Sequence, residues 1–181
     1  MPRNAIEALY EGDIDKAREL LPPDEELDVF EAAAFGRLER LRQIVEAERS
    51  QLTAFSDDGF TALHLAVFAQ QEDAVALLIE RGADVNALSN ASFARVPPLG
   101  TAAFVRSVAL ARRLLDAGAD VNGQGEGGFT ALHTAAQNGD ESLIRLLLER
   151  GADPTIEMSD GRRATDLAAD DALRTLLTRG A

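Results

Sequence analysis

The chain has 181 residues, of which 46% are hydrophobic and 27% are charged, and its formal net charge is −13. This composition is typical of a globular protein, and no apolar run reaches the roughly 18 residues that a membrane-spanning helix needs. The absence of cysteine excludes disulfides, thiol nucleophiles and cysteine-ligated zinc. The first residues contain no apolar core of signal-peptide length, so we expect a cytoplasmic protein that uses no membrane and no cofactor.

The negative charge is concentrated at one end, because residues 1–31 contain ten acidic and only three basic side chains. Such an end either is a solvated surface that keeps the chain soluble or offers a docking edge to a basic partner. No basic stripe could displace counterions from phosphates, so a nucleic-acid partner is not expected. Lys16 is the single lysine among many arginines, a bias typical of GC-rich bacterial genomes.

Two short strings recur along the chain. Residues 82–86 read GADVN, residues 118–122 repeat the same letters, and residues 151–153 read GAD. Residues 61–66 read TALHLA, and residues 130–135 read TALHTA. A fixed period of this kind predicts an array of similar units rather than one globular core.

Apolar residues at positions i, i+3 and i+4 recur six times, which predicts one apolar stripe on each of six short helices. A helix of this length buries its stripe only by stacking on its neighbours, so we expect these residues in the core. The triplets are Ala17/Leu20/Leu21, Leu41/Ile44/Val45, Val75/Leu78/Ile79, Ala111/Leu114/Leu115, Ile144/Leu147/Leu148 and Leu173/Leu176/Leu177.

Each full unit is predicted to contain two helices and a glycine stop. The first helix is expected over residues 63–69 and 132–138, and the second over residues 73–81 and 141–150. Gly82, Gly118 and Gly151 stand where a helix C-cap requires a positive φ, while Thr61 and Thr130 stand where a hydroxyl can cap a helix N-terminus.

These strings resemble the ankyrin repeat, whose consensus includes T-P-L-H-x-A within about 33 residues. The resemblance covers essentially the whole chain and implies a single all-α solenoid of helix-turn-helix units with short β-hairpin fingers. Asp58-Gly59 and Gly127-Gly128 suit the finger turns. The expected units are an N-terminal cap (1–27), repeats at 28–56 and 57–89, an irregular repeat (90–124), a repeat at 125–157 and a C-terminal cap (158–181).

The irregular repeat departs from the pattern in three ways. Its finger contains three extra residues, and Pro97 and Gly100 replace the Thr and His of the motif. Arg106 stands where Gly12, Gly36 and Gly139 make the interhelix turn in other copies, and Gln70 makes a similar change one repeat earlier. These departures indicate either drift in a tolerant loop or a functional site.

His64 and His133 are the only histidines, and both occupy the fourth position of the motif. In ankyrin repeats this residue bonds to the motif Thr and to backbone, so the resemblance implies a structural role and not a metal site or an enzyme. The glycine cluster at residues 123–128 lacks the preceding strand and following lysine of a phosphate-binding loop, and we expect a flexible finger.

The phenylalanines are the candidate partner-binding residues. In ankyrin arrays the partner is contacted by the finger tips and by the residues just before the interhelix turn, on the concave face. The alternative is that these rings pack between fingers or under helices. The candidate set contains Phe68 and Phe104 at the same pre-turn position, Phe35 one place later, Phe60 and Phe129 at one finger position, Phe93 in the long finger, and Arg95 and Arg106 beside them.

An apolar groove of this kind on a soluble chain favours a protein interface with aromatic and arginine anchors. The predicted function is therefore a non-catalytic scaffold, adaptor or inhibitor that binds a protein partner through its concave face, acting as a monomer. The alternative is peptide or small-molecule sensing in the groove near the irregular repeat.

Overall fold

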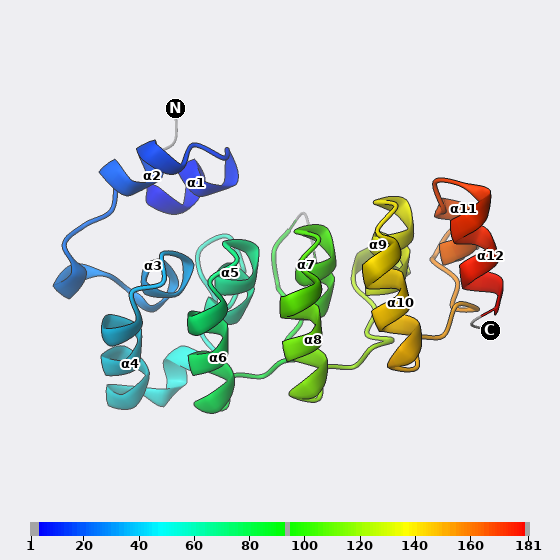
Figure 1. Ribbon diagram of the computed structural model, residues 1–181. Helices are drawn as coiled ribbons and strands as arrows, with labels where there is room; N and C mark the ends of the chain where they lie inside the picture. Colours follow the sequence, from blue (N-terminus) through cyan, green and yellow to red (C-terminus); the bar gives the residue numbers. More distant parts are fainter. Residues whose placement is uncertain (1–3, 93–94, 180–181) are drawn as a thin grey trace. The chain divides into compact units, whose positions relative to one another are not determined.

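The computed structural model describes residues 4–92 and 95–179. Its described residues form twelve α-helices and three short 3-10 helices, and no strand occurs among them, which confirms the predicted all-α class. The chain divides into two compact units, residues 1–84 and 85–181, which are described separately (Figure 1).

The first unit contains six α-helices among its described residues. They are α1 (Ala5–Tyr10), α2 (Ile14–Glu19), α3 (Val29–Ala34), α4 (Leu38–Ala47), α5 (Ala62–Phe68) and α6 (Glu72–Glu80), with 3-10 turns at Asp24–Glu26 and Arg49–Leu52. Helices α3 and α5 lie side by side, as do α4 and α6, so two helical hairpins are stacked in this unit.

The second unit repeats this arrangement with three hairpins. Its helices are α7 (Pro98–Phe104), α8 (Val108–Asp116), α9 (Ala131–Gln137), α10 (Glu141–Glu149), α11 (Ala164–Leu167) and α12 (Asp171–Arg179), with a 3-10 turn at Glu126–Gly128. The first helices α7, α9 and α11 form one layer, and the second helices α8, α10 and α12 form the other. Helices this short are marginal alone, so their stability comes from this stacking.

The core of both units follows the predicted triplets. Val75, Leu78, Leu114, Ile144 and Leu147 are completely buried. One member of each later triplet is only half-buried, at Ile44, Ile79, Leu115, Leu148 and Leu176. The first triplet fits least well, because α2 ends at Glu19 and both leucines that follow it are half-buried.

The second helices end as predicted. Gly82, Gly118 and Gly151 have φ values of 92°, 92° and 87°. The next residue then donates its N–H to the carbonyl five positions earlier, as Ala83 does to Leu78 at 2.9 Å. This is the Schellman arrangement, in which one left-handed residue closes the helix end.

The turns between the two helices of a hairpin also use one left-handed residue. It is a glycine at Gly12, Gly36 and Gly139, with φ values of 77°, 64° and 69°. Gln70 and Arg106 adopt the same conformation, with φ values of 55° and 57°. The left-handed region is costly for residues with a Cβ atom, so both positions are strained.

The fingers differ from the predicted β-hairpins, because they are tight loops. One backbone bond closes each loop, from Ser56 N to Phe60 O at 2.9 Å and from Gly125 N to Phe129 O at 2.7 Å. Among the described residues the single antiparallel bridge joins Glu157 and Arg163.

Asparagine side chains link neighbouring hairpins through the loops that follow the second helices. Asn86 accepts from Asp120 N at 2.7 Å, and Asn122 repeats this bond to Asp153 N at 2.8 Å. The asparagine of each GADVN string thus ties its own loop to the loop that follows the next second helix.

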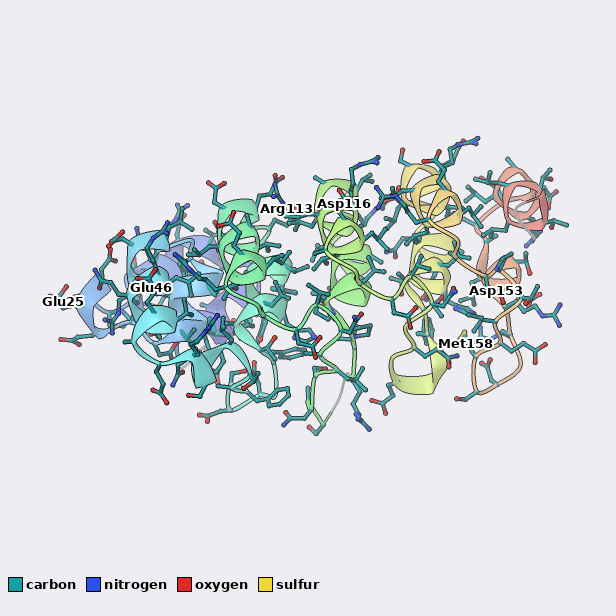
Figure 2. All side chains as sticks on the ribbon, turned by 90° about the horizontal axis from the view of Figure 1, so that it is seen from below. Glu25, Glu46, Arg113, Asp116, Asp153 and Met158 are labelled. Atoms are coloured by element: carbon teal, nitrogen blue, oxygen red, sulfur yellow. The ribbon has the colours of Figure 1, made fainter. Side chains whose placement is uncertain are left out.

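Ion pairs between second helices are also repeated. Arg81 pairs with Glu46 of α4 at 2.7 Å, and Arg150 pairs with Asp116 of α8 at 2.8 Å; Figure 2 labels both acids. Surface pairs of this kind contribute about 1 kcal/mol or less to stability. No described helix combines the length and the apolarity that crossing a bilayer requires.

Replacing Gln70 or Arg106 by glycine is expected to stabilise the fold. The left-handed conformation costs about 1–2 kcal/mol, and the greater freedom of glycine in the unfolded chain cancels roughly 0.5–1 kcal/mol of the gain. Gln70→Gly and Arg106→Gly should each raise the free energy of unfolding by about 0.5–1 kcal/mol. Urea denaturation followed by circular dichroism measures this change.

Gly139→Ala is the matched control, because a Cβ atom there meets only Ala169 Cβ at an ordinary 3.7 Å. It should destabilise the chain by a similar amount through backbone strain alone. Unchanged or lower stability of both glycine variants would show that the turns are not strained.

Candidate protein-binding surface

Two of the candidate aromatics occupy equivalent helix ends. Phe68 is the last residue of α5, and Phe104 is the last residue of α7. Each stands two positions before the left-handed residue of its turn. Phe35 is the C-cap residue of α3, so it lies one place later in its hairpin, as the sequence predicted.

Phe104 is the most exposed large hydrophobic residue among those described, with 65% of its surface accessible. Arg106 also faces solvent, and its guanidinium lies 3.9 Å from the carboxylate of Asp140 at the start of α10. Asn138, in the next hairpin, donates to the carbonyl of Ala103 at 3.3 Å. The second unit therefore presents an exposed ring beside mixed polar groups.

Phe68 has a different environment, because Tyr10 of α1 packs against it. The two ring centroids are 5.1 Å apart and the rings meet edge to face, while Phe60 lies 6.4 Å from Tyr10. The Tyr10 hydroxyl donates to Asp58 Oδ2 at 2.6 Å. Burial raises the pKa of Tyr10 above its usual value, and the hydrogen bond to Asp58 and the charge of Asp58 raise it further.

The two finger phenylalanines are half-buried and stand against the motif histidines. Phe60 lies 5.9 Å from His64, and Phe129 lies 6.0 Å from His133, between ring centroids. Phe35 is half-buried as well. Phe93 falls outside the residues that the structure describes.

Arg95 is exposed, but its backbone fixes the long finger to the next one. Its carbonyl accepts from Glu126 N at 2.6 Å, and its N–H donates to the Glu126 carboxylate at 3.3 Å. Gly125 permits this approach, because a Cβ atom there would lie 2.6 Å from the Arg95 carbonyl oxygen.

A serine supports the irregular finger in which the motif Thr and His are missing. Ser89 is completely buried, and its hydroxyl accepts from Val96 N at 2.9 Å. Ser56 does the same for Phe60 N at 3.0 Å in the first finger. Gly100 is required for packing, since a Cβ atom would lie 2.6 Å from Val96 Cγ2.

Both histidines are buried and bonded within their own repeats. Thr61 Oγ1 lies 2.8 Å from His64 Nδ1, and Thr130 Oγ1 lies 2.8 Å from His133 Nδ1. The backbone N–H of each histidine in turn donates to the hydroxyl of the same threonine at 3.4 Å. In each of these repeats the threonine and the histidine side chain together therefore contribute to capping the N-terminus of the first helix, α5 or α9. In the described part of the chain, no group of three or more His, Cys, Asp or Glu is placed to hold a metal ion.

Tyr10 and Phe55 are surface aromatics that were not among the predicted site residues. Phe55 is 42% exposed beside the first finger, and Tyr10 covers Phe68. Tyr10 is the only tyrosine of the chain, which is the one sequence signal that could have singled it out.

Ankyrin-repeat family models match most of the chain. A single-repeat model matches residues 58–90, and a model of three copies matches residues 94–181. The chain is an ankyrin-repeat protein. Ankyrin repeats generally act as protein–protein interaction modules and are generally not enzymes.

Several curated ankyrin-repeat relatives are similar over part of their length. The mouse B-cell lymphoma 3 protein homolog is 43% identical over 96 residues, covering 53% of this chain and 21% of its own. A putative ankyrin repeat-containing protein of Treponema pallidum is 40% identical over 136 residues, covering 68% of this chain and 45% of its own. Human ankyrin repeat and SOCS box protein 6 is 42% identical over 108 residues, covering 56% of this chain and 25% of its own. The chain thus spans less than half of each relative.

Acidification is expected to destabilise the ankyrin fold through His133. Burial lowers its pKa below the ordinary 6.5, partly offset by the backbone of Arg162 and Ile156 and by the charge of Asp160. Below pH 6.5 the unfolded chain therefore binds more protons than the folded one. The free energy of unfolding should fall as pH drops below about 6.5. The contribution of His133 to this fall should end once pH is below the pKa of His133 in the folded chain, because both states are then protonated.

The measurement compares urea unfolding at pH 7.5 and pH 5.5 for the parent chain and His133→Gln. The variant should lose less stability on acidification than the parent does. An NMR titration should also give His133 an imidazole pKa below 6.5. A pKa at or above 6.5 would contradict this account of the buried ring.

Proposed function

We propose that this chain is a non-catalytic protein–protein interaction module, a scaffold, adaptor or inhibitor. The partner is a protein, and it contacts the first helices and fingers, which form the concave face in this family. We further propose, on the sequence grounds given above, a cytoplasmic monomer built from the six predicted units.

The exposure of Phe104 is the observation that carries the proposal. A phenylalanine that is 65% accessible leaves most of its apolar surface in water, which is unfavourable unless a partner covers it. It lies at the pre-turn position that contacts partners in this family. Aromatic and arginine side chains dominate the binding energy of protein interfaces, and Arg106 stands two residues away.

The charged groups near Phe104 support recognition of a partner as well as burial of the ring by it. Arg106, held in the left-handed conformation two residues after Phe104, has an exposed cation, and its 3.9 Å contact with Asp140 is a long one. A partner carboxylate could therefore bind the guanidinium at little cost. The expected partner surface is an apolar pocket with an acidic edge.

Phe104→Ala tests the proposal. Because the ring is mostly exposed, the free energy of unfolding should change by less than about 0.5 kcal/mol. Partner affinity should fall by about 2 kcal/mol or more, roughly 30-fold, if Phe104 is an anchor. Affinity capture from a lysate of the source cells identifies the partner, and titration of the purified partner then measures the loss of affinity.

Ile14→Ala is the control for removing an exposed apolar side chain elsewhere, since Ile14 is 42% exposed on α2. It should leave both stability and partner binding unchanged. Leu147→Ala, at a completely buried position of α10, should cost about 2–5 kcal/mol of stability. Full partner affinity in stable Phe104→Ala would sink the proposal for this surface.

A further inference from the structure

Two asparagines of the second unit are followed directly by glycine, at residues 122–123 and 138–139. In such a pair the backbone nitrogen of the glycine can attack the side-chain amide, because glycine has no Cβ atom to hinder the approach. Asn86 occupies the loop position of Asn122 one repeat earlier, but alanine follows it. The second unit thus contains two candidate sites for this reaction and one natural control.

Asn122 lies in a loop that water can reach. Asn122 and Gly123 follow α8 outside any helix, and both are half-buried rather than enclosed. Their backbone is held by one residue, because Asn122 N donates to Asp120 Oδ1 at 2.9 Å and Gly123 N donates to Asp120 O at 3.0 Å. A fluctuation of a few residues therefore releases both reacting groups.

Asn138 is held more firmly, at the end of α9. Its backbone is helical, with φ −76° and ψ −11°, which turns the nitrogen of the following glycine away from the asparagine Cβ. Asn138 N donates to Thr134 O at 3.0 Å, and its side chain donates to Ala103 O at 3.3 Å. The end of the helix must unwind before the glycine nitrogen can reach this side chain, so the structure favours reaction at Asn122.

The side chain of Asn122 links two loops, so a change in its chemistry affects the fold. Its Oδ1 accepts from Asp153 N at 2.8 Å and its Nδ2 donates to Gly151 O at 3.4 Å, both in the loop after α10 (Figure 2 labels Asp153). A carboxylate has no N–H for the Gly151 carbonyl, and it would lie near the Asp120 carboxylate, which accepts from Asn122 N. Replacing the amide removes one bond and adds repulsion between like charges.

We propose that Asn122 is a site of spontaneous deamidation and that the reaction loosens the link between the loop after α8 and the loop after α10. The bonds of the closed loop engage both reacting groups, so the reaction proceeds from the open loop and records how often this link opens. This modification is separate from partner binding and does not involve Phe104.

The reaction needs water and no enzyme. Gly123 N loses its proton to solvent and attacks Asn122 Cγ, the new C–N bond closes a cyclic imide, and the Cγ–Nδ2 bond breaks. The leaving nitrogen takes up a proton and departs as ammonia. Water then adds to one of the two imide carbonyls: breaking the bond from Cγ to the nitrogen gives aspartate, and breaking the bond from the main-chain carbonyl carbon gives isoaspartate. Neither product can donate to Gly151 O as the amide does.

The test incubates the folded chain at pH 8 and 37 °C and follows each asparagine by peptide mass spectrometry. Isoaspartate is counted separately by methylation with an isoaspartyl methyltransferase. Asn122 should be modified at least about tenfold faster than Asn86 or Asn138, because one lacks the glycine and the other is held in a helix end. In guanidinium chloride, Asn122 and Asn138 should react at similar rates, since the fold no longer distinguishes them.

Gly123→Ala is the matched variant, because Ala87 already occupies the equivalent position after Asn86. The rate at Asn122 in this variant should fall at least about tenfold, to the rate at Asn86. Asn86 is a fair comparison, since its Oδ1 accepts from Asp120 N at 2.7 Å and its Nδ2 donates to Gly118 O at 3.2 Å.

The effect on the link is measured by hydrogen exchange of the modified chain, separated from the unmodified chain by ion exchange. Amides of residues 151–157 should exchange at least about tenfold faster in the modified chain, whereas those of α7 should keep their rates. Asn122→Ala removes both side-chain bonds without any reaction and should accelerate exchange in the same residues.

Equal rates at Asn122 and Asn138 in the folded chain would overturn the assignment of the site. So would an Asn122 that stays unmodified in the folded chain while it reacts in guanidinium chloride. Unchanged exchange over residues 151–157 in the modified chain would overturn the loosening of the link.

Discussion

Each of the first five hairpins must reverse the chain within a few residues, and a single left-handed residue makes that reversal possible. In these five hairpins, the irregular repeat included, the residue after this turn donates its N–H to the carbonyl of a completely buried alanine, at 2.9–3.0 Å in each case. These alanines are Ala8, Ala32, Ala66, Ala102 and Ala135. A bulkier residue there would separate adjacent helices, so turn geometry and stacking distance are set together.

The same turn determines where the candidate anchors stand. Phe68 and Phe104 each end a first helix two positions before the left-handed residue, so the turn gives them equivalent positions in their repeats. Their environments then differ, because Tyr10 covers one ring and the other is 65% exposed. Position in the repeat therefore fixes where these side chains stand, and long-range neighbours such as Tyr10 determine how much of each ring is exposed.

Much of this arrangement was predictable from the sequence. The glycine stops, the Thr–His caps and the helix limits follow local rules, and the observed helices begin and end within one residue of the predicted limits in the regular copies. The position of α1 was not predictable, because Tyr10 and Asp58 are 48 residues apart and belong to no motif. The exposure of Phe104 likewise depends on neighbours that a repeat consensus does not specify. Arg106 and Gln70 are intermediate: the missing glycine was visible, but only the structure shows that both keep the left-handed turn.

The acidic character of the N-terminal end has two physical consequences that composition alone cannot separate. Carboxylates such as Glu25, labelled in Figure 2, are exposed and keep this end hydrated. Asp28, Glu31, Asp57 and Asp58 instead line one hollow between α3 and the first finger, so their mutual repulsion opposes the packing of these elements. Salt should therefore stabilise the first unit by screening this repulsion, whereas it would weaken attraction to a basic partner. Ionic strength thus separates the two consequences, because the stability of the first unit and the affinity for a basic partner change in opposite directions.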